Sequence, residues 1–99
     1  MDVEPLPEAI SDIRKFEPET REILWENIVE LEEKGLDHEN SELIWLKGDP
    51  VYRLKIVDRD KAVNHRVVFN VYDGKIVIIA VFDRDSRDGY PEKMIEGRK

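Results

Sequence analysis

The hydrophobic period of this chain changes once, and this change constrains its fold more than any other feature. Up to residue 34, apolar residues recur every three or four positions, which is the spacing of one helix face. Between residues 52 and 72 they alternate with other residues, which is the spacing of half-buried strands. Helices followed by strands predict an α+β domain, with the helices packed against an antiparallel sheet.

Two helices are predicted in the first third of the chain. One apolar stripe covers residues 6–16, and Pro7 suits the first turn because a missing N–H costs nothing there. Pro18 interrupts this stripe and can begin a second helix, whose own stripe runs over residues 24–31. Gly35 predicts the end of that helix, because glycine readily adopts the left-handed conformation. The result is an N-terminal helical hairpin.

A tight turn and an apolar run organise the predicted sheet. Asp73-Gly74 predicts a two-residue hairpin, because a type I′ turn needs two positive φ angles. The run after it, residues 75–82, is almost entirely Ile and Val, which indicates a strand that is buried on both faces. We therefore expect a curled antiparallel sheet of three to four strands and a short C-terminal helix. The remaining strand candidates are residues 43–46, 52–57 and 63–72, and the C-terminal helix is expected at residues 91–96.

The composition excludes several kinds of site. The length fits one domain over residues 1–99, which can bury a core without a metal or a disulfide. The chain has no cysteine, no pair of spaced histidines and no glycine-rich phosphate loop, so neither a metal nor a cofactor is expected. No signal peptide or membrane-spanning run is expected either. These features predict a cytoplasmic protein without a membrane partner.

Charge is distributed unevenly along the chain. The net charge is −7. Residues 1–50 contribute 15 acidic and 5 basic side chains, whereas residues 51–99 contribute 8 acidic and 11 basic ones. The imbalance suggests an acidic face and a more basic working face. The alternative interpretation is an acidic helical surface that only faces water.

The second half carries a series of motifs in a fixed order. They resemble the RelE/ParE toxin superfamily in their order and spacing, over roughly residues 8–95 of this chain. The stretch after Phe82, in which Pro91 can open a helix, is also similar to the HigB-like branch. The motifs are Gly48 followed by Tyr52-Arg53, then Arg66-Val67-Val68-Phe69, Asp73-Gly74, Asp83-Arg84 at the end of the apolar run, and Tyr90.

The resemblance implies the toxin of a toxin–antitoxin pair. Many members cut messenger RNA on the ribosome and another branch inhibits DNA gyrase, and an antitoxin normally covers the toxin. The first hypothesis is therefore a ribosome-associated, metal-independent mRNA endoribonuclease whose antitoxin folds onto the helices and the sheet. The alternative is a non-catalytic module on the same fold, either a gyrase inhibitor or a divergent inactive toxin.

The resemblance also implies which residues would act. Arg66 and Arg84 would hold the scissile phosphate, because guanidinium groups match phosphate oxygens. Tyr90 would stack on a base or assist proton transfer. Four further cations would bind RNA. They are Arg53, Lys55, Arg59 and Arg87.

Several features favour other roles for these residues. Arg53 and Lys55 could form the solvent face of a strand. Arg84 lies between Asp83 and Asp85, so it could form a local ion pair, and Asp83 could repel a nearby phosphate. Tyr90 could simply hold the C-terminus on the core. His65 shares a strand face with apolar residues and is expected to be packed rather than catalytic.

Overall fold

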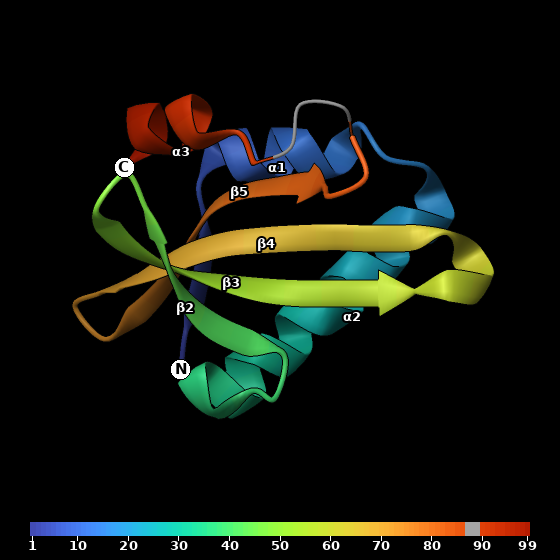
Figure 1. The fold of residues 1–99 in the computed structure, drawn as a ribbon. Coiled ribbons are helices and arrows are strands. Elements are labelled where there is room, and N and C mark those ends of the chain that lie inside the picture. Colours follow the sequence, from blue (N-terminus) through green and yellow to red (C-terminus); the bar gives the residue numbers. More distant parts are fainter. Residues whose placement is uncertain (87–89) are drawn as a thin grey trace.

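A five-stranded sheet forms the centre of the molecule, and α1 and α2 cover one of its faces (Figure 1). The computed structural model describes residues 1–86 and 90–99. The predicted α+β architecture is confirmed. The elements are β1 (Val3–Pro5), α1 (Pro7–Arg14), α2 (Pro18–Lys34), β2 (Ser41–Leu46), β3 (Asp49–Asp58), β4 (Val63–Tyr72), β5 (Lys75–Asp83) and α3 (Glu92–Arg98), with 3-10 turns at Gly35–Asp37 and Arg59–Lys61.

The sheet order is β1-β5-β4-β3-β2, and the neighbours are antiparallel except for β1 with β5. β1 adds a fifth strand to the three or four predicted. It pairs with Ile76 to Ile78, and its ends are extended by bonds from Ile76 N to Asp2 O at 2.8 Å and from Leu6 N to Ile78 O at 2.9 Å. A three-residue strand ending at a proline shows no alternation, so the sequence pattern does not predict it.

Two tight turns determine the strand register. Asp73 and Gly74 have φ angles of 51° and 76°, which confirms the predicted turn between β4 and β5. Lys47 and Gly48 have φ angles of 51° and 83° and join β2 to β3 in the same way, a turn that the sequence analysis missed. β5 lies between β1 and β4, as its apolar sequence predicted.

Each face of the sheet has its own core. The larger core lies under α1 and α2 and includes Ile13, Leu24, Leu54 and Phe69. The smaller core lies on the other face at one end, where Ile95 of α3 packs on the sheet. The remainder of that second face carries no helix in the described parts of the chain, and we call it the open face. No described helix is long and apolar enough to cross a membrane.

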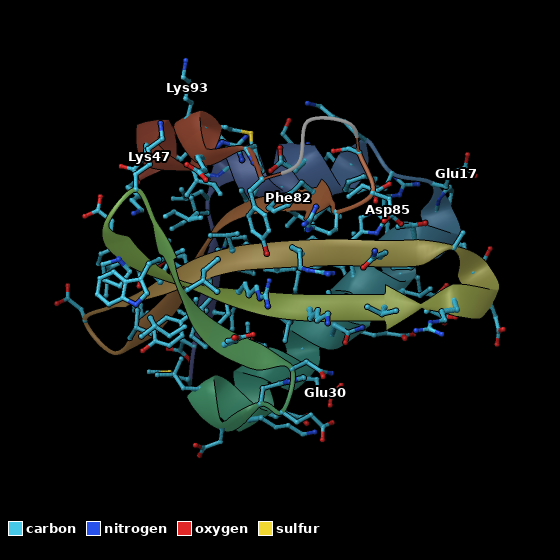
Figure 2. The ribbon with its side chains drawn as sticks, in the orientation of Figure 1. Glu17, Glu30, Lys47, Phe82, Asp85 and Lys93 are labelled. Carbon is cyan, nitrogen blue, oxygen red and sulfur yellow. The ribbon has the colours of Figure 1, made fainter. Side chains whose placement is uncertain are left out.

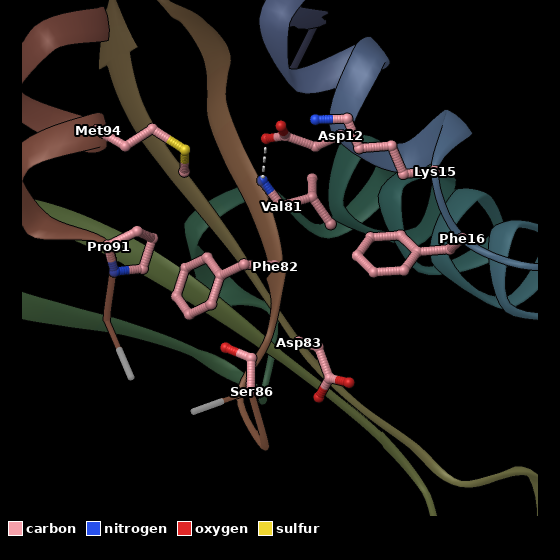
Figure 3. A pocket seen from close by; sticks show the side chains of 9 residues that line it. All are labelled: Asp12, Lys15, Phe16, Val81, Phe82, Asp83, Ser86, Pro91 and Met94. Carbon is pink, nitrogen blue, oxygen red and sulfur yellow. Dashed lines mark hydrogen bonds between the residues drawn. The ribbon is translucent and has the colours of Figure 1, made fainter. Parts of the chain in front are cut away.

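An ion pair between buried Asp12 and partly buried Arg98 holds α3 in place. Arg98 donates from Nη1 to Asp12 Oδ2 at 2.6 Å and from Nη2 to Asp12 Oδ1 at 3.1 Å, so the pair is bidentate. Asp12 Oδ2 also accepts from Val81 N at 3.0 Å (Figure 3). Arg98 Nη1 donates in addition to Ile79 O at 3.1 Å. The carboxylate of Asp12 thus connects α1, α3 and the part of β5 that β1 does not pair with.

Candidate nucleic-acid interface

Strand register brings the predicted cations together on the open face. Lys55 pairs with Arg66, and Arg66 pairs with Phe82, so one row crosses three strands. Arg53 lies one row away on the same face, since side chains two residues apart on a strand point the same way. Figure 2 looks onto this face and labels Phe82 on it. Strand alternation already predicts a shared face for Arg53 and Lys55, and the register adds Arg66 of the neighbouring strand to it.

Arg66 is held rigidly although it is a long cation. Its exposed fraction is 6%. Nη1 donates to Asn64 Oδ1 at 2.8 Å and to His65 O at 3.0 Å, which fixes the guanidinium plane. Nε is buried and has no hydrogen-bond partner among the described residues. An arginine fixed in this way can bind an anion without first losing side-chain entropy.

A polar hollow of about 410 Å³ adjoins Arg66 near the turn that joins β3 to β4. Lys55 and Arg59 line it, so two predicted RNA-binding residues lie beside Arg66. Asn64 contributes an amide and Asp85 contributes a carboxylate to the same wall. Asn64 Nδ2 donates to Asp85 Oδ1 at 3.0 Å, so this carboxylate has a neutral partner within the wall.

Tyr90 connects two further predicted arginines, Arg53 and Arg84. Arg53 Nη1 donates to Tyr90 Oη at 2.7 Å, and Arg84 Cζ lies 5.2 Å from the centre of the Tyr90 ring, which is within the range of a cation–π contact. The ring also meets Phe82 edge-on, with the ring centroids 5.2 Å apart. Tyr90 therefore contacts the core and two cations at once, which shows the packing role, while its role toward RNA stays a prediction.

Glu42 on β2 competes for Arg53. Arg53 Nη2 donates to Glu42 Oε2 at 2.8 Å. The hydrogen bonds to Tyr90 and then to Glu42 raise the pKa of Arg53, so it stays cationic. The hydrogen bond from Arg53 lowers the pKa of Glu42 in turn. A phosphate that approaches Arg53 would meet a guanidinium that already holds a carboxylate.

Asp83 does not face the arginines, contrary to the concern raised by the sequence. It pairs with His65 in the register and follows Phe82, so its side chain points to the helix side of the sheet. Figure 3 shows Phe82 and Asp83 on opposite sides of β5, at the rim of an apolar pocket of about 290 Å³ between α1 and α3. Repulsion by Asp83 at the open face was therefore a wrong prediction, because it ignored strand alternation.

Arg84, Arg87 and His65 are the remaining residues that the sequence singled out. No ion pair within residues 1–86 and 90–99 involves Arg84, so the local pair with Asp83 or Asp85 does not form. Arg87 lies outside the described residues. His65 is packed as predicted, with an exposed fraction of 4% and its ring edge-on to Phe16 at 4.5 Å. Burial lowers the pKa of His65.

Comparison with known proteins identifies the fold. No protein-family model matches the sequence, and a search of curated proteins gives no match. The E. coli toxin RelE, as a double arginine-to-alanine mutant in the free state, matches with a TM-score of 0.64 and 21% identity over 98% of this chain and 90% of that chain. The archaeal RelE–RelB complex from Pyrococcus horikoshii OT3 matches with a TM-score of 0.64 and 19% identity over 85% of this chain and 94% of that chain. This chain has the RelE fold.

The RelE-like fold confirms the resemblance found in the motifs. At sequence identities of 19% and 21%, this likeness shows the architecture alone. The HigB-like character of the C-terminal stretch stays a prediction.

The sequence analysis missed one polar residue of the open face, Glu42, and one contact there, the hydrogen bond between Asn64 and Arg66. Glu42 lies before the segment predicted as the first strand, so it was not placed opposite Arg53. The signal was the Lys47-Gly48 pair, because a two-residue turn there sets Glu42 against Arg53. Strand alternation puts Asn64 and Arg66 on one face, but the hydrogen bond between them depends on side-chain conformation, which the sequence does not reveal.

Proposed function

We propose that this chain is the toxin of a toxin–antitoxin pair and acts in the cytoplasm as a ribosome-associated mRNA endoribonuclease. The observation that carries the proposal is the convergence of Arg53, Lys55, Arg66, Arg84 and Tyr90 on the open face. The RelE-like fold supports it, since the solved structures with this fold include a protein described as a toxin.

The chemistry requires three things of these side chains. The 2′-hydroxyl must lose a proton, the charge on the pentavalent phosphate must be stabilised, and the 5′ oxygen must gain a proton. Arg66 and Arg84 would hold the phosphate, because preorganised cations stabilise developing charge best. Lys55, Arg53 and Arg59 would guide the RNA strand. Tyr90, bonded to Arg53, would stack on a base or take part in proton transfer.

The proposed partner is an antitoxin that covers the toxin. One structure with the same fold is described as a RelE–RelB complex, which motivates the proposal. The antitoxin would pack on the helices and the sheet. A short antitoxin-like gene beside the one for this chain would support the pairing.

RNA cleavage can be tested in a translating extract by mapping RNA ends. The wild-type chain should produce new ends in translated messages. Arg84→Ala and Tyr90→Phe should reduce cleavage by at least about a hundredfold, the lower end of the range for one general-acid or electrostatic contribution. Arg14→Ala is the matched control, since Arg14 is an exposed cation on α1 at the opposite face. Messages that stay uncut with the wild-type chain would contradict the nuclease activity.

The second candidate is a non-catalytic binding module on the same fold. The carboxylates of Glu42 and Asp85 beside the arginines and the net charge of −7 favour it, because both weaken RNA binding. A gyrase assay separates the two candidates. Inhibition of supercoiling by this chain, with translation unaffected, would support the second.

A further inference from the structure

β2 is an edge strand with unusually little protection. It is hydrogen-bonded to β3 on one side, and no described strand lies on its other side. Its pairing with β3 is continuous from Ser41 to Leu46, without a bulge. Edge strands normally carry prolines, bulges or several charges that prevent association, whereas this one has a single charge, at Glu42. Its backbone is therefore available to a further strand.

Two of the exposed side chains of β2 are large and apolar. Trp45 has an exposed fraction of 65% and Leu43 of 46%. Both lie on the helix side of the sheet, because they pair with Pro50 and Tyr52, whose side chains share the face of Leu54. Two such residues two positions apart on a free edge form an apolar strip that a partner strand would cover.

The turn shows which backbone groups are free. A two-residue hairpin places Leu46 and Asp49 in a hydrogen-bonded pair, and the bond from Lys55 N to Asn40 O at 3.0 Å fits the same alternation. Residues 42, 44 and 46 therefore bond to β3, and the N–H and C=O groups of Leu43 and Trp45 point outward. The outward groups belong to the same residues that carry the apolar strip.

We propose that β2 joins two copies of this chain edge to edge, with a two-fold axis at Ile44. In this antiparallel register Leu43 lies opposite Trp45 of the second copy, so each copy covers the apolar strip of the other. Lys47 of each copy then lies opposite Ser41 of the other, next to Glu42 and two residues from Glu39, so opposite charges meet at both ends of the interface. The strand is complementary to itself in side chains, backbone and charge.

The arrangement leaves the open face uncovered. Side chains that are paired across antiparallel strands point to the same side, so the open faces of both copies face one direction. The two copies would present their cationic residues side by side, and the dimer does not depend on the proposed RNA chemistry.

Sedimentation velocity of the full-length chain tests the dimer. The wild-type chain should show a monomer–dimer equilibrium, and Trp45→Lys should weaken dimerisation by at least about a hundredfold because a charge enters the apolar centre of the interface. Val29→Lys, which changes an exposed apolar residue of α2, should dimerise like the wild type. A wild-type chain that stays monomeric at every concentration, or a Trp45→Lys variant that still dimerises, overturns the proposal.

A cysteine on the axis tests the register. The chain has no cysteine of its own, so Ile44→Cys provides a single thiol per copy. The two thiols would meet in a non-hydrogen-bonded pair, whose Cβ separation is close to that of a disulfide. Mild oxidation should cross-link Ile44→Cys, whereas Ser41→Cys, three residues from the axis, should stay monomeric on a non-reducing gel. Equal cross-linking of both variants contradicts this register.

Discussion

At the scale of single residues, the open face combines fixed cations with carboxylates that oppose them. Arg66 is fixed by Asn64, and Arg53 is shared between Tyr90 and Glu42. The sequence indicated the arginines through the resemblance of its motifs to the RelE/ParE superfamily. It did not indicate Glu42, because the effect of a carboxylate on the site depends on which side chain lies opposite it on the neighbouring strand.

Removing the carboxylate of Glu42 should increase anion affinity. Glu42→Gln keeps the size of the side chain and frees one charge-assisted bond of Arg53. We expect binding of a short single-stranded RNA to tighten by about three- to tenfold, measured by fluorescence anisotropy at low salt. Glu4→Gln on β1 removes an equal charge far from Arg53 and should leave the affinity unchanged. Equal affinities of the wild type and Glu42→Gln would show that Glu42 does not compete with RNA.

His65 should make the fold less stable in acid. Burial lowers the pKa of His65 below its ordinary value of 6.5, so the unfolded chain binds more protons than the folded chain as the pH falls below that value. The contribution of neutral, buried His65 to the free energy of unfolding is complete above that pH and is lost progressively below it. Urea midpoints at about pH 7.5 and about pH 5.5 should differ less for His65→Leu than for the wild type. The same difference in both proteins would contradict this assignment.

At the scale of elements, packing rather than local preference holds the C-terminal helix. α3 has only seven residues, which is too short to be stable alone. Its attachment consists of buried Ile95 and the ion pair of Arg98 with Asp12. The sequence predicted a helix here but not its attachment, because Asp12 and Arg98 are 86 residues apart.

Breaking this ion pair should destabilise the fold strongly. Arg98→Gln leaves the buried Asp12 carboxylate with the Val81 amide but without its cation. We expect the free energy of unfolding to fall by about 3 kcal/mol, as for other buried pairs that lose one partner. Chemical denaturation measures the loss. Lys93→Gln, which removes an exposed cation from the same helix, should change stability by less than about 0.5 kcal/mol.

At the scale of the whole molecule, the fold separates charges that the net value conceals. α2, which carries several exposed glutamates, lies on the far side of the sheet from the open face (Figure 1), so an acidic chain can still present a cationic surface. The uneven charge of the two halves of the sequence suggested such a division.

Salt dependence should report the open face alone. The logarithm of RNA affinity should fall linearly with the logarithm of salt concentration, with a slope of about −0.7 for each phosphate that is contacted. Lys55→Gln in the polar hollow should make this slope shallower by about 0.7. Arg14→Gln on α1 should leave the slope unchanged. A slope that both variants reduce equally would mean that binding is not confined to the open face.

The sequence by itself determined the class of the fold, both helices of the hairpin and the β4–β5 turn. These depend on neighbours along the chain, such as the helical stripe, Pro18, Gly35 and Asp73-Gly74, and local conformational preferences are enough to predict them. The tertiary structure alone decided that β1 joins β5, that Asp83 faces away from the arginines and that Glu42 meets Arg53. Each of these depends on the register between strands that are distant in sequence, and a shift of one residue would turn every side chain to the other face.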